Sequence, residues 1–197
     1  MTSPQRATFG RLSIVAGNAV QLAGLVVACL ALAEARSLHS RALAFCMSAT
    51  AWILLYFFCH AIAHWAVGRV VGIRFVRYTV GGTANPAGYP GLLRWIFEHL
   101  PFFGVQTEKA SMQVASAHAR ATMWSAGVTS SIVVPTLGAF YAWRSGTPYS
   151  TILLGFSIFW SIGTLSSNWR SKTGDFTKAR LALNAAAFPA TRRTDSQ

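Results

Sequence analysis

Four long stretches of hydrophobic residues dominate the chain, and each is long enough to cross the hydrocarbon core of a bilayer. A membrane-spanning helix needs about 20 predominantly apolar residues. The stretches run from about Leu12 to Ala33, Ala42 to Val67, Ala121 to Trp143, and Tyr149 to Ser167. The pattern predicts an all-α multi-pass membrane protein whose single membrane domain covers residues 1–190, followed by a flexible tail at residues 191–197.

The long segment between the second and third stretches has a different pattern. Ile73 to Val80 is rich in β-branched and aromatic residues and precedes Gly81-Gly82, which is a turn signal. It predicts a strand or a short β-hairpin whose edge could pair with an extended peptide. A second run is too short to span and is expected at the membrane interface. Its apolar members are Leu92, Leu93, Trp95, Ile96, Leu100, Phe102 and Phe103.

The composition indicates a lipid environment and argues against nucleic acid as a partner. The chain has 53% hydrophobic and 11% charged residues, whereas soluble domains carry about 25% charged residues. Its formal charge is +12, but the basic residues form short clusters beside the apolar stretches, as expected for contact with anionic headgroups. Cys29, Cys46 and Cys59 lie inside apolar stretches without the spacing of a metal-binding pair. We therefore expect the lipid bilayer as the partner.

The distribution of basic residues predicts the orientation of the spans. Of the 17 Lys and Arg residues, 14 lie near the termini or in the long middle loop, and the others are Arg36, Arg41 and Arg144. Positive charge is retained in the cytoplasm, so both termini and the ends of the second and fourth spans are expected there. Ala33-Glu34-Ala35 resembles a signal-peptidase site. The first stretch is longer than a signal core, which favours a retained helix.

His60 and His64 are the chemically informative residues of the second span. They are four residues apart, so they project from one face of a helix, and two imidazoles in that relation can hold one metal ion. Ionisable residues inside a span are costly and usually functional. The alternative is that both histidines meet interfacial water and headgroups. A haem is disfavoured, because residues four apart on one helix cannot supply both of its axial ligands.

The residues around this pair resemble the site-2 protease family of intramembrane zinc metalloproteases. That family has His-Glu-x-x-His at the end of a membrane helix, followed by a small residue, Arg, and Gly beside a β-branched residue. A β-hairpin with a Gly-Gly turn often comes next, as Gly81-Gly82 does here. The matching positions in this chain are His60, Ala63, His64, Gly68, Arg69, Gly72 and Ile73.

The resemblance also implies a third metal ligand, because the family supplies an Asp near the inner end of a later helix. Asp175 follows Asn168 just beyond the fourth span, and the expected topology places it at a depth similar to that of the histidines. His60, His64 and Asp175 with an open fourth position would suit zinc. The alternative is that Asp175 is a solvated residue paired with Lys172 or Lys178. In the third span, Val128 and Ser131 replace the family's Pro and Asn.

The main departure from the family is Ala61, which stands where the resemblance implies the general-base Glu. Without a carboxylate there, no residue can be named as catalytic, and general acid–base assistance worth about 100- to 10,000-fold is lost. A substitute could come from the middle loop, which holds Glu98, His99, Glu108 and His118.

Three functions remain open. Ala61 favours a site-2-protease-like membrane protein that is proteolytically inactive, with zinc at His60, His64 and Asp175 and a role in binding membrane-protein or peptide segments. The second is an active zinc metallopeptidase with a relocated base. The third is a small membrane subunit or scaffold unrelated to proteolysis. The sequence indicates no substrate-binding residues and no oligomeric state.

Overall fold

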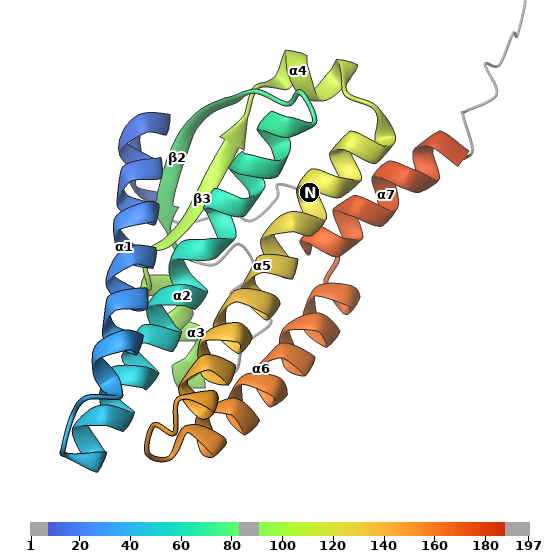
Figure 1. Ribbon diagram of the computed structural model, residues 1–197. Coiled ribbons are helices and arrows are strands. Elements are labelled where there is room, and N and C mark those ends of the chain that lie inside the picture. The colour runs from blue at the N-terminus through green and yellow to red at the C-terminus, as the bar shows by residue number, and fades with distance from the viewer. Residues whose placement is uncertain (1–7, 83–90, 188–197) are drawn as a thin grey trace, which may run out of the picture.

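The computed structural model describes residues 8–82 and 91–187 and has the predicted helical multi-pass architecture (Figure 1). Four helices are long and apolar enough to cross a membrane: α1 (Ile14–Ala35), α2 (Arg41–Val70), α5 (Ala117–Arg144) and α6 (Ser150–Arg170). The remaining elements are β1 (Thr8–Leu12), β2 (Phe75–Gly81), α3 (Gly91–His99), β3 (Phe102–Thr107), α4 (Lys109–Val114) and α7 (Asp175–Ala187). The tail predicted at residues 191–197 lies outside the described residues.

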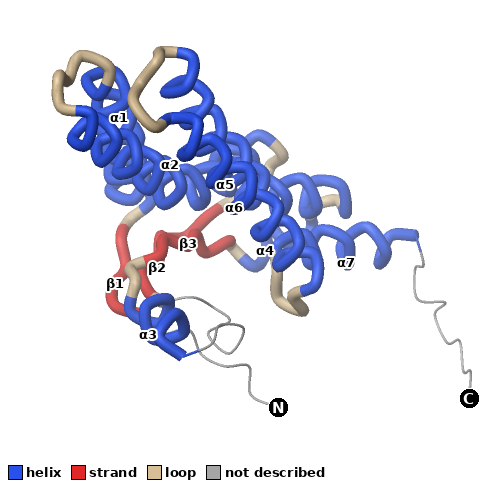
Figure 2. Tube along the Cα trace, turned by 90° about the horizontal axis from the view of Figure 1, so that it is seen from below, coloured by secondary structure: helices blue, strands red, loops and turns tan. Residues whose placement is uncertain are grey.

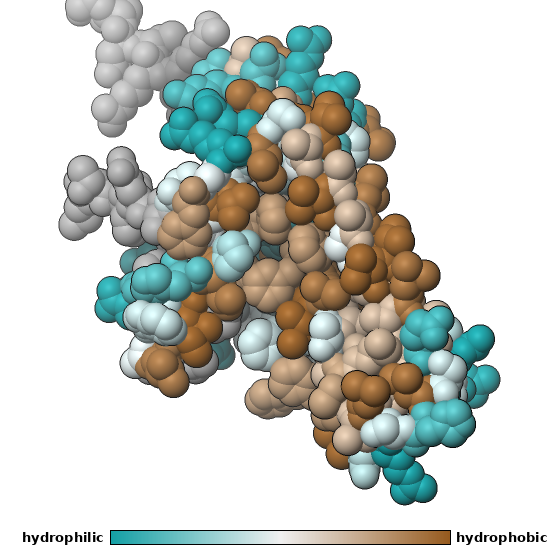
Figure 3. Space-filling model, turned by 90° about the vertical axis from the view of Figure 1, so that its left-hand side faces the viewer, coloured by the Kyte–Doolittle hydropathy of each residue, from teal (hydrophilic) through white to brown (hydrophobic). Residues whose placement is uncertain are grey.

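The long helices lie side by side, with α2 between α1 and α5, and α6 against α5 (Figure 1). One buried cluster joins the first three of these helices and consists of Ala28, Leu32, Ala51, Leu55 and Ala142. Outside this core, large apolar side chains remain exposed along α1, and Figure 3 shows hydrophobic residues over the middle of this face with hydrophilic residues gathered towards its ends. Such a belt is unfavourable in water and is what a bilayer requires.

The helix ends follow local capping signals that a hydropathy pattern does not contain. The third span was expected from Ala121, but α5 begins at Ala117 because the Ser116 side chain accepts a hydrogen bond from the backbone N–H of Ala119. In the same way, Ser40 caps the start of α2. The α2 helix continues to Val70, three residues beyond the expected end at Val67.

The strands form one antiparallel sheet in the order β1-β2-β3. The prediction that Ile73 to Val80 offers a free edge is therefore wrong, because β2 is the central strand and pairs on both sides. β1 was missed: its five residues precede the first span and pair with residues some 70 positions away. The expected hairpin is a three-stranded sheet whose outer strands are β1 and β3.

The sheet lies against one side of the bundle, and α3 lies beyond it (Figure 2). The short apolar run expected at the interface is divided between two elements: α3 holds its first part, whereas Phe102 and Phe103 belong to β3. These two rings lie over Phe57 and Phe58 of α2, with centroids 5.1 and 5.7 Å apart. The sheet is thereby fixed beside the turn of α2 that precedes His60.

Tyr78 of β2 attaches the sheet to α1. Its side chain is fully buried, and its hydroxyl donates a 2.7 Å hydrogen bond to Asn18 Oδ1. A Cβ atom at Gly17 would overlap the Tyr78 ring, so this position of α1 requires glycine. Burial raises the pKa of the Tyr78 hydroxyl, which therefore stays protonated and remains a donor.

Candidate metal centre

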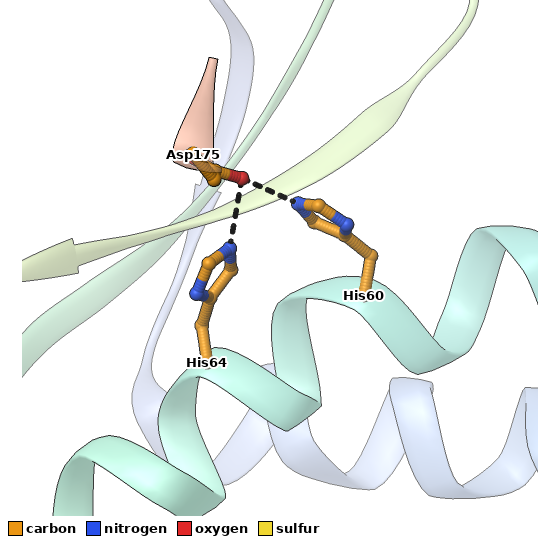
Figure 4. A group of neighbouring side chains, drawn as sticks. All are labelled: His60, His64 and Asp175. Atoms are coloured by element: carbon orange, nitrogen blue, oxygen red, sulfur yellow. Dashed lines mark hydrogen bonds and ion pairs between the residues drawn. The ribbon is translucent and has the colours of Figure 1, made fainter. Parts of the chain in front are cut away.

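Three side chains from two distant parts of the sequence converge beside α5. His60 and His64 project from one face of α2, and Asp175 is the first residue of α7, which packs against α5 (Figure 4). The backbone N–H of Asp175 donates to Asn168 Oδ1 near the end of α6, which fixes the start of α7. The helical spacing of the histidines and the turn after α6 together produce the group.

The distances from Asp175 to the two histidines fit those between neighbouring ligands of a tetrahedral metal site. Asp175 Oδ2 lies 3.4 Å from His60 Nε2 and 3.2 Å from His64 Nε2, and one ligand atom from each residue lies within 4.8 Å of the others. Zinc–ligand bonds of about 2.0 Å place neighbouring tetrahedral ligands about 3.3 Å apart. The group could hold a metal ion, with one coordination position left for another ligand.

The hydrogen bond at His64 Nδ1 determines the tautomer of this ring, and thereby whether Nε2, which faces Asp175, carries a lone pair. His64 Nδ1 lies 2.7 Å from the carbonyl oxygen of Met123, which can only accept, so Nδ1 carries the proton. A neutral His64 then directs the lone pair of Nε2 at a carboxylate oxygen. Two acceptors at 3.2 Å repel each other unless a cation lies between them, and that cation is either a proton or a metal ion.

His60 has a different partner on its far side. Its Nδ1 lies 3.0 Å from the hydroxyl oxygen of Ser131 in α5, and this hydroxyl can donate or accept. When Nδ1 donates to Ser131, Nε2 is free to bind a metal. Both imidazoles are thus oriented from α5, one by a backbone carbonyl and one by a side chain.

Asp175 is held as a carboxylate. Its side chain is 14% exposed, and Lys178 Nζ lies 2.8 Å from Oδ1, the oxygen that does not face the histidines. Burial alone raises the pKa of the Asp175 carboxyl. When protons occupy the two histidine–aspartate contacts, the hydrogen bonds from His60 and His64 and the positive charges of His64 and Lys178 outweigh this effect and hold that pKa well below its usual range. Asp175 thus pairs with Lys178, one of the two lysines expected, but it is mostly buried instead of solvated and also faces both histidines.

Gly127 of α5 makes room for the group. A Cβ atom at this position would overlap the His64 ring at Nε2, the atom that faces Asp175. The small residue thus lets α5 approach α2 at the depth of the site. The contact of Gly127 with His64 becomes visible only in three dimensions.

Ala61 is fully buried and supplies no acid or base. The other groups that could have replaced a base do not belong to the group of described residues that could hold a metal ion. Glu98 pairs with Arg94 on α3, His99 Nδ1 bonds to the Trp95 carbonyl, Glu108 is the residue before α4, and His118 is exposed near the start of α5. Among the described residues, the group that could hold a metal ion contains Asp175 as its carboxylate.

Three neighbours of the group were not identified from the sequence as parts of a site. The Met123 carbonyl is a backbone atom and leaves no signal in the residue pattern. Trp124 contacts His64 edge-on, with ring centroids 5.8 Å apart, and Lys178 lies 4.3 Å from the centroid of the Trp124 ring. Lys178 follows Asp175 by three residues, so a helix predicted at this point would have placed the two together.

Comparisons with protein-family models, with curated proteins and with solved structures find no match.

Proposed function

We propose that this protein is a site-2-protease-like membrane protein that binds zinc, does not hydrolyse peptide bonds, and acts by binding membrane-protein or peptide segments. The observation that carries the proposal is the convergence of His60, His64 and Asp175 beside an alanine at position 61. The sequence pattern around the histidines, given above, supports the relation to the family. The distribution of basic residues supports cytoplasmic termini.

Zinc is proposed because the ligand atoms are two imidazole nitrogens and a carboxylate oxygen. Imidazole suits zinc, copper, iron and nickel, and three protein ligands with one open position are typical of zinc sites that bind a further ligand. The Met123 carbonyl and the Ser131 hydroxyl would orient the two rings, as outer partners of histidine ligands do. When bound, zinc would act as a Lewis acid on that further ligand.

The proposal of inactivity follows from what the surrounding residues can do with a proton. Peptide hydrolysis requires a group that removes a proton from water and passes it to the leaving amine. Ala61 cannot do this, and Asp175 is occupied by two histidines and a lysine. What remains is a site that can bind and orient a ligand.

The test is to co-express the protein with single-span membrane substrates and to look for cleavage fragments. We expect none with wild type, and none with His60→Ala. Fragments that form with wild type and disappear in His60→Ala would contradict the proposal and indicate an active metallopeptidase. In that case Glu98→Gln, His99→Ala, Glu108→Gln and His118→Ala would show which of these groups acts as the base.

A further inference from the structure

Lys178 brings a fixed positive charge to the edge of the metal-binding group. It lies on α7 one turn after Asp175, and its Nζ is 2.8 Å from Asp175 Oδ1. The same ammonium lies over the ring of Trp124, 4.3 Å from the centroid, and that ring in turn contacts the edge of the His64 ring. An ion pair and a cation–π contact therefore hold this charge beside the ligands.

His60 and Lys178 are the most exposed side chains of the group and its lysine neighbour. Their side chains are 34% and 39% exposed, whereas those of His64 and Asp175 are 7% and 14% exposed. A ligand that reaches the open coordination position therefore approaches past an imidazole and an ammonium, rather than past a carboxylate.

The charges around this position favour an anion. A divalent metal and Lys178 together exceed the single negative charge of Asp175, and the buried Ala61 adds none. The remaining acidic side chains in the described part of the chain have other surroundings. Glu34 accepts a hydrogen bond from Ser37, Glu98 pairs with Arg94, and Glu108 precedes α4.

We propose that the open position of this metal site takes a carboxylate, with Lys178 as the residue that selects it over a neutral carbonyl. The proposal rests on the zinc site proposed above and names its ligand class. A carboxylate can be a free anion or the C-terminus of a peptide, and both share the same recognition chemistry. A unit charge about 6 Å away, at an effective dielectric of about 40, changes the affinity of an anion about tenfold.

The first test uses wild-type protein in which cobalt(II) replaces zinc, because the visible absorbance of cobalt reports a change of ligand. Acetate and acetamide are titrated separately, since they have nearly the same shape and differ in charge. We expect acetate to bind at least about ten times more tightly. Tighter binding of N-acetylalanine than of acetate would identify a peptide C-terminus as the source, and equal binding would identify a free carboxylate.

The second test separates the effect of the Lys178 charge from the effect of the net charge of the protein. Lys178→Met should lose about tenfold in acetate affinity per cobalt-loaded site, while Lys178→Arg should keep it. Lys172→Met removes the same charge from an exposed position near the end of α6 and should leave the affinity unchanged. Metal analysis gives the loaded fraction for each variant, so the affinities are compared per occupied site.

Equal affinity of wild type for acetate and acetamide would overturn the carboxylate assignment. So would an unchanged acetate affinity in loaded Lys178→Met, or an equal loss in Lys172→Met. Wild-type protein that takes up no cobalt would instead overturn the metal site itself, which is a distinct failure and is read from the metal content alone.

Discussion

The polar side chains between the helices have different hydrogen-bonding surroundings in two halves of the bundle. In one half, Trp52 Nε1 donates to Ser157 Oγ at 2.9 Å, and Thr136 Oγ1 lies 3.0 Å from Ser157 Oγ and 3.1 Å from Ser161 Oγ. In each of these contacts, an N–H or O–H group can donate a hydrogen bond to a hydroxyl oxygen. In the other half, His64 Nε2 and Asp175 Oδ2 face each other as two acceptors whenever His64 is neutral.

The difference separates polar residues that hydrogen-bond to one another between helices from the histidine–aspartate group, which could hold a metal ion. The hydroxyl and indole groups form hydrogen bonds between α2, α5 and α6 and need nothing from outside, as expected for contacts that associate helices in a membrane. The histidine–aspartate group is complete only with a cation. A buried polar side chain in a span is thus informative about function when its neighbours leave its hydrogen-bonding capacity unmatched.

The largest expected effect comes from Gly127→Ala, which places a methyl group against the ring of His64. We expect metal affinity to fall by more than about 100-fold and the free energy of unfolding to fall by about 1–3 kcal/mol through overpacking. Metal content and thermal unfolding of the protein in detergent would measure both effects.

Gly155→Ala is the matched control for this change. A Cβ atom at Gly155 of α6 would meet no atom within 4 Å, and alanine favours a helix by up to about 1 kcal/mol over glycine. We expect unchanged metal content and unchanged or higher thermal stability. A loss of metal in both variants would mean that the effect of Gly127→Ala is not local to the site.

A smaller effect is expected for Ser131→Ala, which removes the hydroxyl beside His60 Nδ1. Loss of an outer partner of a histidine ligand typically costs about 10- to 100-fold in metal affinity. Ser130→Ala is the control, because its hydroxyl donates to the backbone carbonyls of Gly127 and Cys59, whereas the histidines hydrogen-bond to Ser131, Met123 and Asp175. Competition with a chelator of known affinity would give both values, and equal losses would refute the orienting role of Ser131.

The smallest effect is expected in the other half of the bundle. Trp52→Phe removes the hydrogen bond to Ser157 but keeps an aromatic ring among its neighbours. Interhelical hydrogen bonds in membranes contribute about 0.6 kcal/mol on average, so the free energy of unfolding should fall by about that amount. Metal content should not change, and a loss of metal would show that the two halves are coupled.

The sequence predicted those parts of the histidine–aspartate group that depend on helical spacing and on the order of the spans. The pairing of His60 with His64 follows from helical periodicity, and the depth of Asp175 follows from the number of spans and the positions of basic residues. The pairing of Asp175 with Lys178 was one of the alternatives. The place of Lys178 over the Trp124 ring was not predicted, because no helix was expected after the fourth span.

The position of a strand within the sheet could not be predicted from the sequence. The β-forming residues of Ile73 to Val80 indicated a strand, but its place at the centre of the sheet depends on β1 and β3, which come from distant parts of the chain. In the same way, the Met123 carbonyl orients His64 through the backbone, which carries no residue-specific pattern. Both features arise from tertiary packing.

The most direct test of the metal centre is to measure bound metal by mass spectrometry on detergent-purified protein that has never met a chelator and is shown to be folded. Wild type is compared with His60→Ala and Asp175→Ala, with the exposed His118→Ala as the control. We predict about one zinc per chain in wild type and in the control, and none in the two ligand variants. Absence of metal from wild type, or its retention in both ligand variants, would contradict the proposed site.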